Sequence, residues 1–386
     1  SQKQALGSLF QEKKMPLIAA GLAAAVMGGY ISMLAMSMVQ GPCDEDCLSS
    51  TPSGRPLDLR QGQISALMFD KDLNRPETLM GVKSLRKLMG GLARGHVLEV
   101  AVGTGRNIEY VDWDEIRASA PPVPVWTEDG RVITPEVKDS QQLHKERVAR
   151  RIEAGKKGLT LPGDEAPEVV SYTGVDVSTD VLEVAWGKLR KAVPDLVPRR
   201  RRRSAQEQQQ EHKAATGTPP AAQAVVASPG PVDESLVANL GHGRIRLFQS
   251  DAQLHLPSPP AMTSHDGSRV LPAPQYYDTI MQNFGLCSVA DPQHLLATMA
   301  SKLRPESGRI YLMEHGRGSY GWLNDLLDKF APSHFARYGC WWNRDIEQIV
   351  RQAEQEVPGL EVVRIHRPLV LQGGTTLWIE LKVSSR

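Results

Sequence analysis

Three acidic residues and two glycines mark the part of the sequence whose residue types suit ligand chemistry. The run VLEVAVGTGRN places Glu99 inside a short apolar segment and Gly103 and Gly105 directly after it. Asp176 ends the run YTGVD, and Asp251 follows the run FQS. A glycine-rich turn lets a ligand approach the backbone closely, and a carboxylate can accept hydrogen bonds from both hydroxyls of a ribose. The pattern therefore predicts a site for a ribose-containing ligand.

The fingerprint of dinucleotide-binding folds is incomplete at this turn. That fingerprint requires a third glycine three residues after Gly105, where this sequence has Ile108. A nicotinamide-dependent dehydrogenase is therefore disfavoured.

The acidic residues and glycines can only meet if a parallel sheet positions them. Short apolar runs predict buried strands at residues 96–102, 169–177, 245–249, 277–282, 309–314, 360–366 and 375–383. Helical spacing occurs at residues 64–92, 179–192, 292–303 and 344–356. This alternation predicts an α/β fold with a mostly parallel, seven-stranded sheet and helices on both faces, with ligands bound at the carboxyl edge.

Two segments interrupt the alternation. Residues 114–168 indicate an ordered insertion, with a hairpin at Asp129-Gly130 and a polar, helix-like run at residues 140–155. Residues 198–233 contain five consecutive arginines, a Gln/Glu tract and several prolines, with too little apolar surface to offset the entropy of ordering. We expect the second insertion to be a solvated loop; contact of its arginines with anionic lipid or RNA is the alternative.

Residues 15–39 are uncharged and predict one transmembrane helix. At about 1.5 Å per residue the helix would be roughly 37 Å long, whereas the core of a secretory signal, the alternative, has only about 7 to 15 residues. Lys13 and Lys14 precede the stretch and acidic residues follow it, so we expect residues 1–14 on the positive-inside face. Residues 40–61 are expected to be a linker, and residues 62–386 the folded domain beyond the membrane.

The composition excludes several classes of protein. Of 386 residues, 41% are hydrophobic and 23% charged, which is typical of a globular chain. A formal net charge of +1 provides no field for holding a polyanion, so nucleic acid is not favoured as a partner. Four cysteines are too few for a disulfide scaffold. We expect Cys287 and Cys340 to be reduced packing residues, while Cys43 and Cys47 are either a disulfide or unpaired thiols.

With these features together, the sequence resembles the class I S-adenosylmethionine-dependent methyltransferases over residues 66–383, apart from the insertions. Within that class it is similar to the branch with ubiquinone-type and membrane-bound thiol methyltransferases. The run VLEVAVGTGRN, the run GCWWNRDI at residues 339–346 and the single anchor look most like the fungal OMS-type methyltransferase-like proteins. The resemblance implies a Rossmann-like methyltransferase sheet, S-adenosylmethionine as cofactor, and the mitochondrial inner membrane with the catalytic domain in the intermembrane space.

The resemblance also implies the cofactor-binding residues. They are Glu99, Ala101, Gly103, Thr104, Gly105, Asn107, Asp176, Val177, Asp251, Ala252 and Asn283. The glycine turn and Glu99 would hold the methionine part of the cofactor, Asp176 the ribose, and Asp251 with Ala252 the adenine. Asn283 would lie beside the methyl group. Ala101 replaces the first glycine of the family pattern, and we expect it to narrow the pocket slightly.

Methyl transfer from a sulfonium is an in-line displacement, so alignment and exclusion of water can supply most of the catalysis without a metal. His315 and Asn283 are the expected catalytic residues, with His315 as a base if the acceptor must lose a proton, or otherwise as a structural histidine. Trp341 and Trp342 either cover the acceptor or pack the core. The helix with Phe69-Asp70 either closes over the cofactor or packs on the sheet.

Three functions fit these observations. The first is methyl transfer to a small apolar or membrane-associated acceptor, such as a quinol, a thiol or a lipid. The second is an RNA or protein methyltransferase, which the run Asn283-Phe284-Gly285-Leu286 argues against because enzymes that methylate amino groups carry an Asn/Asp-Pro-Pro-aromatic run there. The third is a non-catalytic, cofactor-binding scaffold for a respiratory or translation complex of the inner membrane, contacted through the anchor helix and the insertions.

Overall fold

The structure is a computed structural model of the chain. It describes residues 63–119, 125–126, 132–133, 168–197, 235–241, 243–263 and 270–385, together with nine residues between Pro16 and Ser32.

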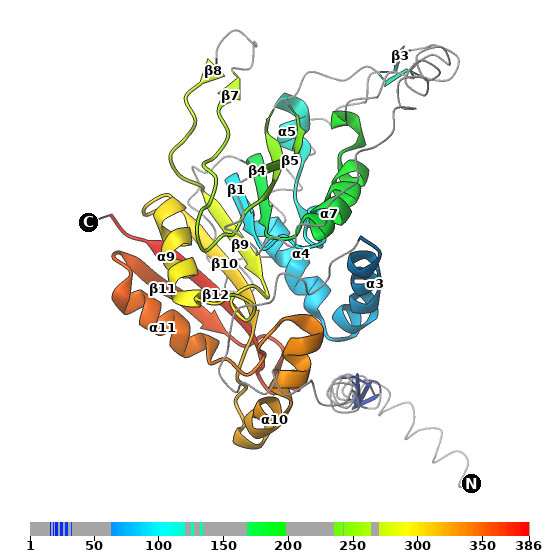
Figure 1. Ribbon diagram of the computed structural model, residues 1–386, viewed down its shortest axis with the longest axis vertical. Coiled ribbons are helices and arrows are strands. Elements are labelled where there is room, and N and C mark those ends of the chain that lie inside the picture. The colour runs from blue at the N-terminus through cyan, green and yellow to red at the C-terminus, as the bar shows by residue number, and fades with distance from the viewer. Residues whose placement is uncertain are drawn as a thin grey trace, which may run out of the picture.

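One sheet forms the centre of the molecule, and its eight strands run in the order β11-β12-β10-β9-β1-β4-β6-β5 (Figure 1). Five neighbouring strands are parallel. They are β1 (Gly95–Val100), β4 (Val169–Asp176), β6 (Ile245–Gln249), β9 (Thr279–Asn283) and β10 (Arg309–His315). Antiparallel β12 (Thr376–Val383) lies between β10 and β11 (Leu360–His366). The predicted α/β class with a mostly parallel sheet is confirmed.

The prediction of seven strands was wrong by one. Each predicted segment contains a strand, and β5 (Ser235–Leu240) adds an eighth, antiparallel to β6 at the edge of the sheet. Only Ala238 and Leu240 are buried in this strand. Because an edge strand buries so little of its surface, its sequence lacks the apolar run by which the other strands are found.

Helices cover both faces of the sheet. One apolar core contains side chains of α4 (Val82–Leu92), α7 (Thr179–Ala192) and α10 (Gly321–Tyr338), and the other contains side chains of α9 (Pro292–Lys302) and α11 (Ile346–Glu356). β1 contributes to both, because Val97 belongs to the first core and Leu98 to the second. Strands covered on both faces are held rigidly, so the residues at their carboxyl ends have fixed positions.

The helical stretch expected at residues 64–92 is divided into α3 (Gln63–Leu79) and α4. Gly81 lies between them with φ 78°, a left-handed conformation that glycine adopts without steric cost. The break lets α4 bury Met89 and Leu92 in the core, while α3 turns away to contact α7 and α4. Helix α3 therefore packs mainly on these two helices.

The start of the predicted first insertion is a helix. Residues 114–119 form α5 (Asp114–Ser119), whose Ile116 is buried in the core beside the sheet. The predicted hairpin is present in the pairing of β2 (Val125–Trp126) with β3 (Val132–Ile133), although its turn at Asp129-Gly130 lies outside the described residues. The run at residues 140–155 and the insertion at residues 198–233 also lie outside them.

Shorter elements complete the described part of the chain. They are η2 (Ile108–Tyr110), η3 (Pro194–Leu196), η4 (Val370–Gln372), and a small hairpin of β7 (Met262–Thr263) and β8 (Val270–Leu271).

Most of the predicted transmembrane stretch lies outside the described residues, as do residues 1–14 and the linker with Cys43 and Cys47. The scattered residues described between Pro16 and Ser32 are helical. Within the residues that the structure describes, none of the helices has the length and hydropathy needed to cross a bilayer.

Candidate functional site

The carboxyl ends of four parallel strands meet at one edge of the sheet. Asp176, at the end of β4, is in register with Gln249 at the end of β6, and Val100 of β1 is in register with Gln282 of β9. The ladder continues into the following loop, since the Ser250 amide donates to the Asp176 carbonyl at 3.0 Å. The predicted residues on these strands are therefore brought to a common edge, as expected for a ligand site of an open α/β sheet.

The turn after β1 has three residues with positive φ. They are Ala101 at 54°, Gly103 at 54° and Gly105 at 71°. A Cβ on Gly105 would lie 2.5 Å from Cδ1 of Ile108 and 3.0 Å from Cβ of Ala185, so α7 passes too close for a side chain. Among the described residues, a Cβ on Gly103 would meet only the Ala101 carbonyl, at 3.9 Å. Neighbouring side chains thus pack closely against Gly105, whereas the described residues leave the space beside Gly103 open.

Asp176 points at this open part of the turn. Its Oδ2 accepts a hydrogen bond from the Gly103 amide at 2.8 Å, and its Oδ1 accepts one from the Ser178 amide at 3.0 Å. The carboxylate is half-buried. These two amides fix the orientation of the carboxylate beside the turn.

The remaining residues predicted on this side follow β4 and β6. Asp251 accepts from the amide and the side chain of Gln253, at 3.0 and 3.2 Å, which orders the turn after β6. Ala252 packs against the second apolar core. The carbonyl of Val177 accepts from Gln249 at 3.2 Å. These residues lie beside Asp176, where an adenine is expected.

Glu99 is buried below the turn, 3% exposed. Its Oε2 accepts from the Tyr172 hydroxyl at 2.6 Å and its Oε1 from the Asn107 side-chain amide at 3.0 Å. Burial raises the pKa of Glu99 to about 7, although the bond from Tyr172 and the charge of Arg86 oppose the shift. The carboxyl group thus changes its protonation close to neutral pH.

We predict that Glu99 makes stability depend on pH. The folded protein holds the Glu99 proton more tightly than the unfolded chain does, with pKa values of about 7 and 4.5. Protonation of Glu99 adds about 3 kcal/mol to the free energy of unfolding. This contribution is complete below about pH 4.5 and is lost as the pH rises through about 7. Glu99→Gln should flatten this part of the profile in urea unfolding experiments, while Glu183→Gln on exposed α7 surface should not. Equal profiles for Glu99→Gln and the unsubstituted protein would contradict the assignment.

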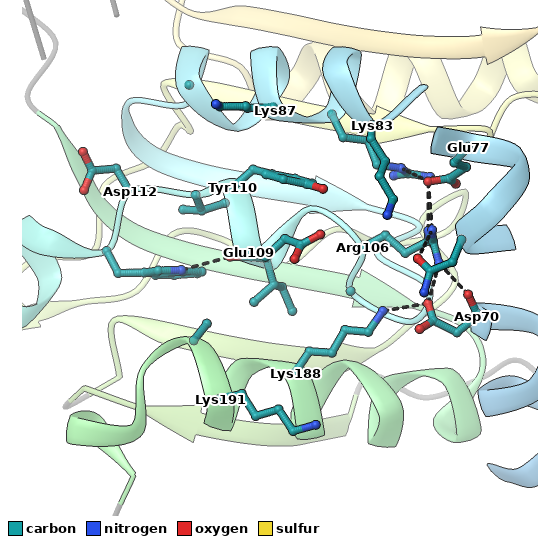
Figure 2. A pocket seen from close by; sticks show the side chains of 18 of the residues that line it. Asp70, Glu77, Lys83, Lys87, Arg106, Glu109, Tyr110, Asp112, Lys188 and Lys191 are labelled. Atoms are coloured by element: carbon teal, nitrogen blue, oxygen red, sulfur yellow. Dashed lines mark hydrogen bonds and ion pairs between the residues drawn. The ribbon is translucent and has the colours of Figure 1, made fainter. Parts of the chain in front are cut away.

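Helix α3 is joined to the turn by a group of charged side chains (Figure 2). Arg106 lies between Glu77 and Asp70, at 3.0 and 2.9 Å, and Lys188 of α7 reaches Asp70 at 2.6 Å. The Thr104 hydroxyl also donates to Asp70, at 2.7 Å. Burial alone would raise the pKa of Asp70, but the bonds from Lys188 and Thr104 and the neighbouring positive charges hold it below its usual range. Helix α3 thus contacts the glycine turn through Asp70, and its closure over the cofactor stays a prediction.

Arg86 extends the charged group to the other side of the turn. It binds Glu77 through two bonds, at 3.0 and 2.9 Å, and donates to Asn107 at 3.0 Å. Asn107 is fully buried, so it acts here as a link between Arg86 and Glu99. Sequence reasoning missed Arg86, Glu77 and Tyr172, because each belongs to a different element and their pairing follows only from the packing.

The loop after β9 forms the opposite wall. With its amide oriented to satisfy its neighbours, Asn283 accepts from Arg86 at 3.0 Å. Phe284 has φ 55°, and its ring lies 4.1 Å from the ring of His315. Buried Glu314 accepts from the amides of Gly285 and Leu286, at 3.0 and 3.1 Å, which fixes this loop.

His315 lies at the end of β10, against the Phe284 ring. Burial lowers the pKa of His315 to about 4. The charge of Arg86 lowers this pKa further, whereas the charge of Glu77 raises it. The imidazole is therefore neutral at pH 7 and a weak base. Its predicted catalytic role remains a prediction.

Trp341 and Trp342 are packing residues in this structure. They are 2% and 4% exposed, with Trp341 stacked on Phe335 and Trp342 on His334 at ring distances of 4.3 and 3.9 Å. The indole of Trp342 donates to the Leu327 carbonyl at 2.9 Å.

Cys287 and Cys340 are buried free thiols whose sulfur atoms lie 2.7 Å apart. Their burial fits the prediction that they are packing residues, and their reduced state stays a prediction.

A cavity of about 710 Å³ lies behind the turn, between α4 and α7. Its walls include Lys83, Lys188, Glu109 and Tyr110 (Figure 2). Gly105 is the only one of the predicted cofactor-binding residues that lines it. Asp176 and Gly103 do not line this cavity. Among the residues that the structure describes, no cluster of His, Cys, Asp and Glu has the arrangement of a metal site.

Comparisons with known proteins give a family match over most of the chain. A profile of the methyltransferase domain matches residues 83–358. The mitochondrial methyltransferase OMS1 of Saccharomyces cerevisiae is 25% identical over 304 residues, which is 79% of this chain but 43% of that protein, so the match spans less than half of the relative's length.

Solved structures give weaker likenesses. Magnesium protoporphyrin IX methyltransferase from Synechocystis, with bound SAH, has a TM-score of 0.35 at 12% identity and 84% and 90% coverage of this chain and that chain. An O-methyltransferase family protein from Burkholderia thailandensis has a TM-score of 0.43 at 11% identity and 93% and 72% coverage.

Proposed function

Because the chain belongs to the methyltransferase-domain family, whose cofactor is S-adenosylmethionine, we propose that it transfers the cofactor's methyl group to a small, apolar, membrane-associated acceptor. The observation that carries the proposal is the Asp176 carboxylate on the Gly103 amide, at the open side of the glycine turn. The alternatives are a non-catalytic cofactor-binding scaffold and, less favoured, an RNA or protein methyltransferase.

The described residues fit the cofactor. A ligand can lie against Gly103 because no side chain of the described residues comes within 4 Å of a Cβ added there. Asp176 is placed to accept from the ribose hydroxyls, and Asp251 with Ala252 to border the adenine. Glu99 and the turn would face the methionine part, where the ligand's ammonium group favours the ionised carboxylate. The cofactor supplies an electrophilic methyl group on a sulfonium, and the chain's contribution is to hold the reactants in line and to exclude water.

The wall formed by Phe284 and His315 favours an acceptor that releases its proton readily. A general base is most effective when its pKa lies near the working pH, and the pKa of His315 is about 4. Glu314 is fully buried, its Oε1 accepts from two backbone amides, and burial raises the pKa of its carboxyl group well above the usual range. An aliphatic thiol, with a pKa of about 8.5, ionises more easily than a phenol at about 10. Among a thiol, a quinol and a lipid, we therefore place the thiol first.

We predict that His315 is not required as a base. His315→Gln should lower the rate of methyl transfer by less than about tenfold, whereas loss of a true general base costs about 100-fold or more. The measurement is the pH profile of kcat/KM from pH 6 to 9, which should keep its shape. A loss of about 100-fold together with a changed profile would assign proton transfer to His315.

Mitochondrial placement is supported by the relative, which is named as mitochondrial. We infer that residues 15–39 anchor the chain in the inner membrane, with residues 1–14 in the matrix, a linker at 40–61, and the methyltransferase domain at 62–386 facing the intermembrane space. The support is the uncharged stretch and the lysines before it. The anchor and the insertions at about 114–168 and 198–233 are the surfaces on which an inner-membrane protein complex would assemble.

The test of function is transfer of a labelled methyl group. The full chain, reconstituted in vesicles, is incubated with labelled S-adenosylmethionine and a mitochondrial membrane extract, with or without nuclease or protease. We expect label in an organic-soluble product that survives both enzymes. Label lost with nuclease or protease would indicate RNA or protein as acceptor, and cofactor binding without any transfer would favour the scaffold.

A further inference from the structure

Five large apolar side chains are exposed together near the start of α10. They are Leu79, Tyr320, Trp322, Val370 and Leu371, with exposed fractions of 57%, 50%, 65%, 74% and 48%. We call them the α10–η4 patch. Scattered exposed apolar residues are normal on a soluble surface, but a contiguous group indicates an interaction site.

Three contacts bring together the elements that carry the patch. The rings of Tyr320 and Trp322 are stacked, with centroids 6.3 Å apart. Gly373, which directly follows η4, accepts from the Ser319 amide at 2.8 Å and lies against the Tyr320 ring. The side chain of Gln372 donates to the Met80 carbonyl at 2.9 Å, which places the end of α3 beside η4.

The patch lies on the side of the molecule where the parallel strands end. Tyr320 follows His315, the last residue of β10, by only five positions. Figure 1 shows α10 beyond the sheet, at the end of the molecule away from the β7–β8 hairpin. A partner on this patch would therefore lie next to the edge that holds the proposed site.

The charges around the patch are balanced. Arg317 pairs with Asp328 at 2.8 Å and Arg367 with Glu347 at 3.0 Å. A surface without excess positive charge has no electrostatic reason to bind an acidic protein or nucleic acid. Its content of tryptophan, tyrosine and aliphatic side chains is the composition that proteins place at the interface of a lipid bilayer.

We propose that the α10–η4 patch rests on the surface of the bilayer in which the chain is anchored. The proposal rests on the anchor inferred above, because a tether at residues 15–39 holds the domain close to one membrane. A tethered surface meets the bilayer at a high local concentration, so a contact of a few side chains is populated even when it is weak in free solution. The contact turns the carboxyl edge toward the lipid, from which an apolar acceptor can enter.

The test is quenching of tryptophan fluorescence by brominated lipid. The full chain is reconstituted in phosphatidylcholine vesicles with plain or brominated acyl chains. Trp113, Trp341, Trp342 and Trp378 are buried, whereas Trp322 is 65% exposed. Brominated lipid should quench the unsubstituted protein, Trp322→Phe should remove most of that quenching, and Trp186→Phe, on half-buried α7 surface, should retain it. Equal quenching in Trp322→Phe and the unsubstituted protein, or no quenching in either, would overturn the proposal.

A second pair of variants tests the patch without removing the reporter. Val370→Asn combined with Leu371→Asn should reduce quenching by about half or more, because the contact depends on buried apolar area. Leu254→Asn, at a site 66% exposed outside the patch, should leave it unchanged. Raising the salt to about 1 M should have little effect, since the bordering charges are paired. Loss of quenching in high salt, or equal loss in Leu254→Asn, would contradict the proposal.

Experiments on the same vesicles test the patch contact, the membrane anchor and the activity separately. Carbonate extraction reports the anchor: protein that is released lacks a membrane-spanning segment. Protein that resists extraction but shows no quenching through Trp322 contradicts the patch alone. Neither measurement depends on methyl transfer, which is assayed independently.

Discussion

Replacing Asp176 with alanine should weaken S-adenosylmethionine binding by roughly 100-fold or more. A carboxylate that accepts from two ribose hydroxyls makes charge-assisted bonds worth about 1.5–3 kcal/mol each, and 1.4 kcal/mol corresponds to tenfold in affinity. The substitution also leaves the Gly103 and Ser178 amides without their acceptor, which loosens the turn itself. The measurement is calorimetric titration of the full chain with S-adenosylmethionine and S-adenosylhomocysteine.

Two variants make the Asp176 result specific. Asp176→Asn keeps the shape and one acceptor oxygen, so its affinity should fall between those of the alanine variant and the unsubstituted protein. Asp72→Ala, on exposed α3 surface, removes one negative charge away from the turn and should bind normally. Unfolding curves confirm that each variant is folded. Normal affinity in a folded Asp176→Ala would remove the ribose assignment.

Gly105→Ala should lower the free energy of unfolding by about 2–5 kcal/mol. A left-handed conformation costs an L-residue about 1–2 kcal/mol, and overpacking adds about 1–3 kcal/mol. Both apply at Gly105, because φ is 71° and the new Cβ would lie 2.5 Å from Ile108 and 3.0 Å from Ala185. Relief requires movement of the turn or of α7, and either movement displaces the turn from Asp176.

Gly103→Ala is the matched control for Gly105→Ala. Its φ is also positive, at 54°, but its Cβ would meet only the Ala101 carbonyl at 3.9 Å. It should therefore lower stability by only about 1–2 kcal/mol while still reducing cofactor affinity, since the methyl group enters the open side of the turn. Urea unfolding of the two variants gives the comparison, and equal losses of stability would show that the packing behind Gly105 is loose.

The strands and the positions of the acidic residues could be predicted because both are local properties of the sequence. A buried parallel strand needs a continuous apolar run, and a turn with positive φ favours glycine, so β1, β4 and β6 and the turn after β1 leave clear signals. Strand β5 left none, because only two of its residues are buried. The division between α3 and α4 was also missed, since the apolar spacing continues past Gly81.

The charged group behind the turn could not be predicted, because its members come from separate elements. Glu77 and Arg86 pair with each other from different helices. Arg106 contacts Glu77, and Lys188 contacts Asp70, because α3 is turned toward α7. The raised pKa of Glu99 likewise depends on its burial beside Tyr172, a residue of another strand. The lowered pKa of His315 follows from burial that its position at a strand end does not reveal. Spacing locates chemically competent residues, while packing decides their protonation and partners.

The most direct measurement of the central claim is a crystal structure of the full chain with S-adenosylhomocysteine. We predict that the ribose hydroxyls contact Asp176, that the adenine borders Asp251 and Ala252, and that the amino-acid part lies against Gly103 above Glu99. A ligand found instead in the cavity of about 710 Å³ between α4 and α7, beside Lys83 and Lys188, would contradict the proposed site.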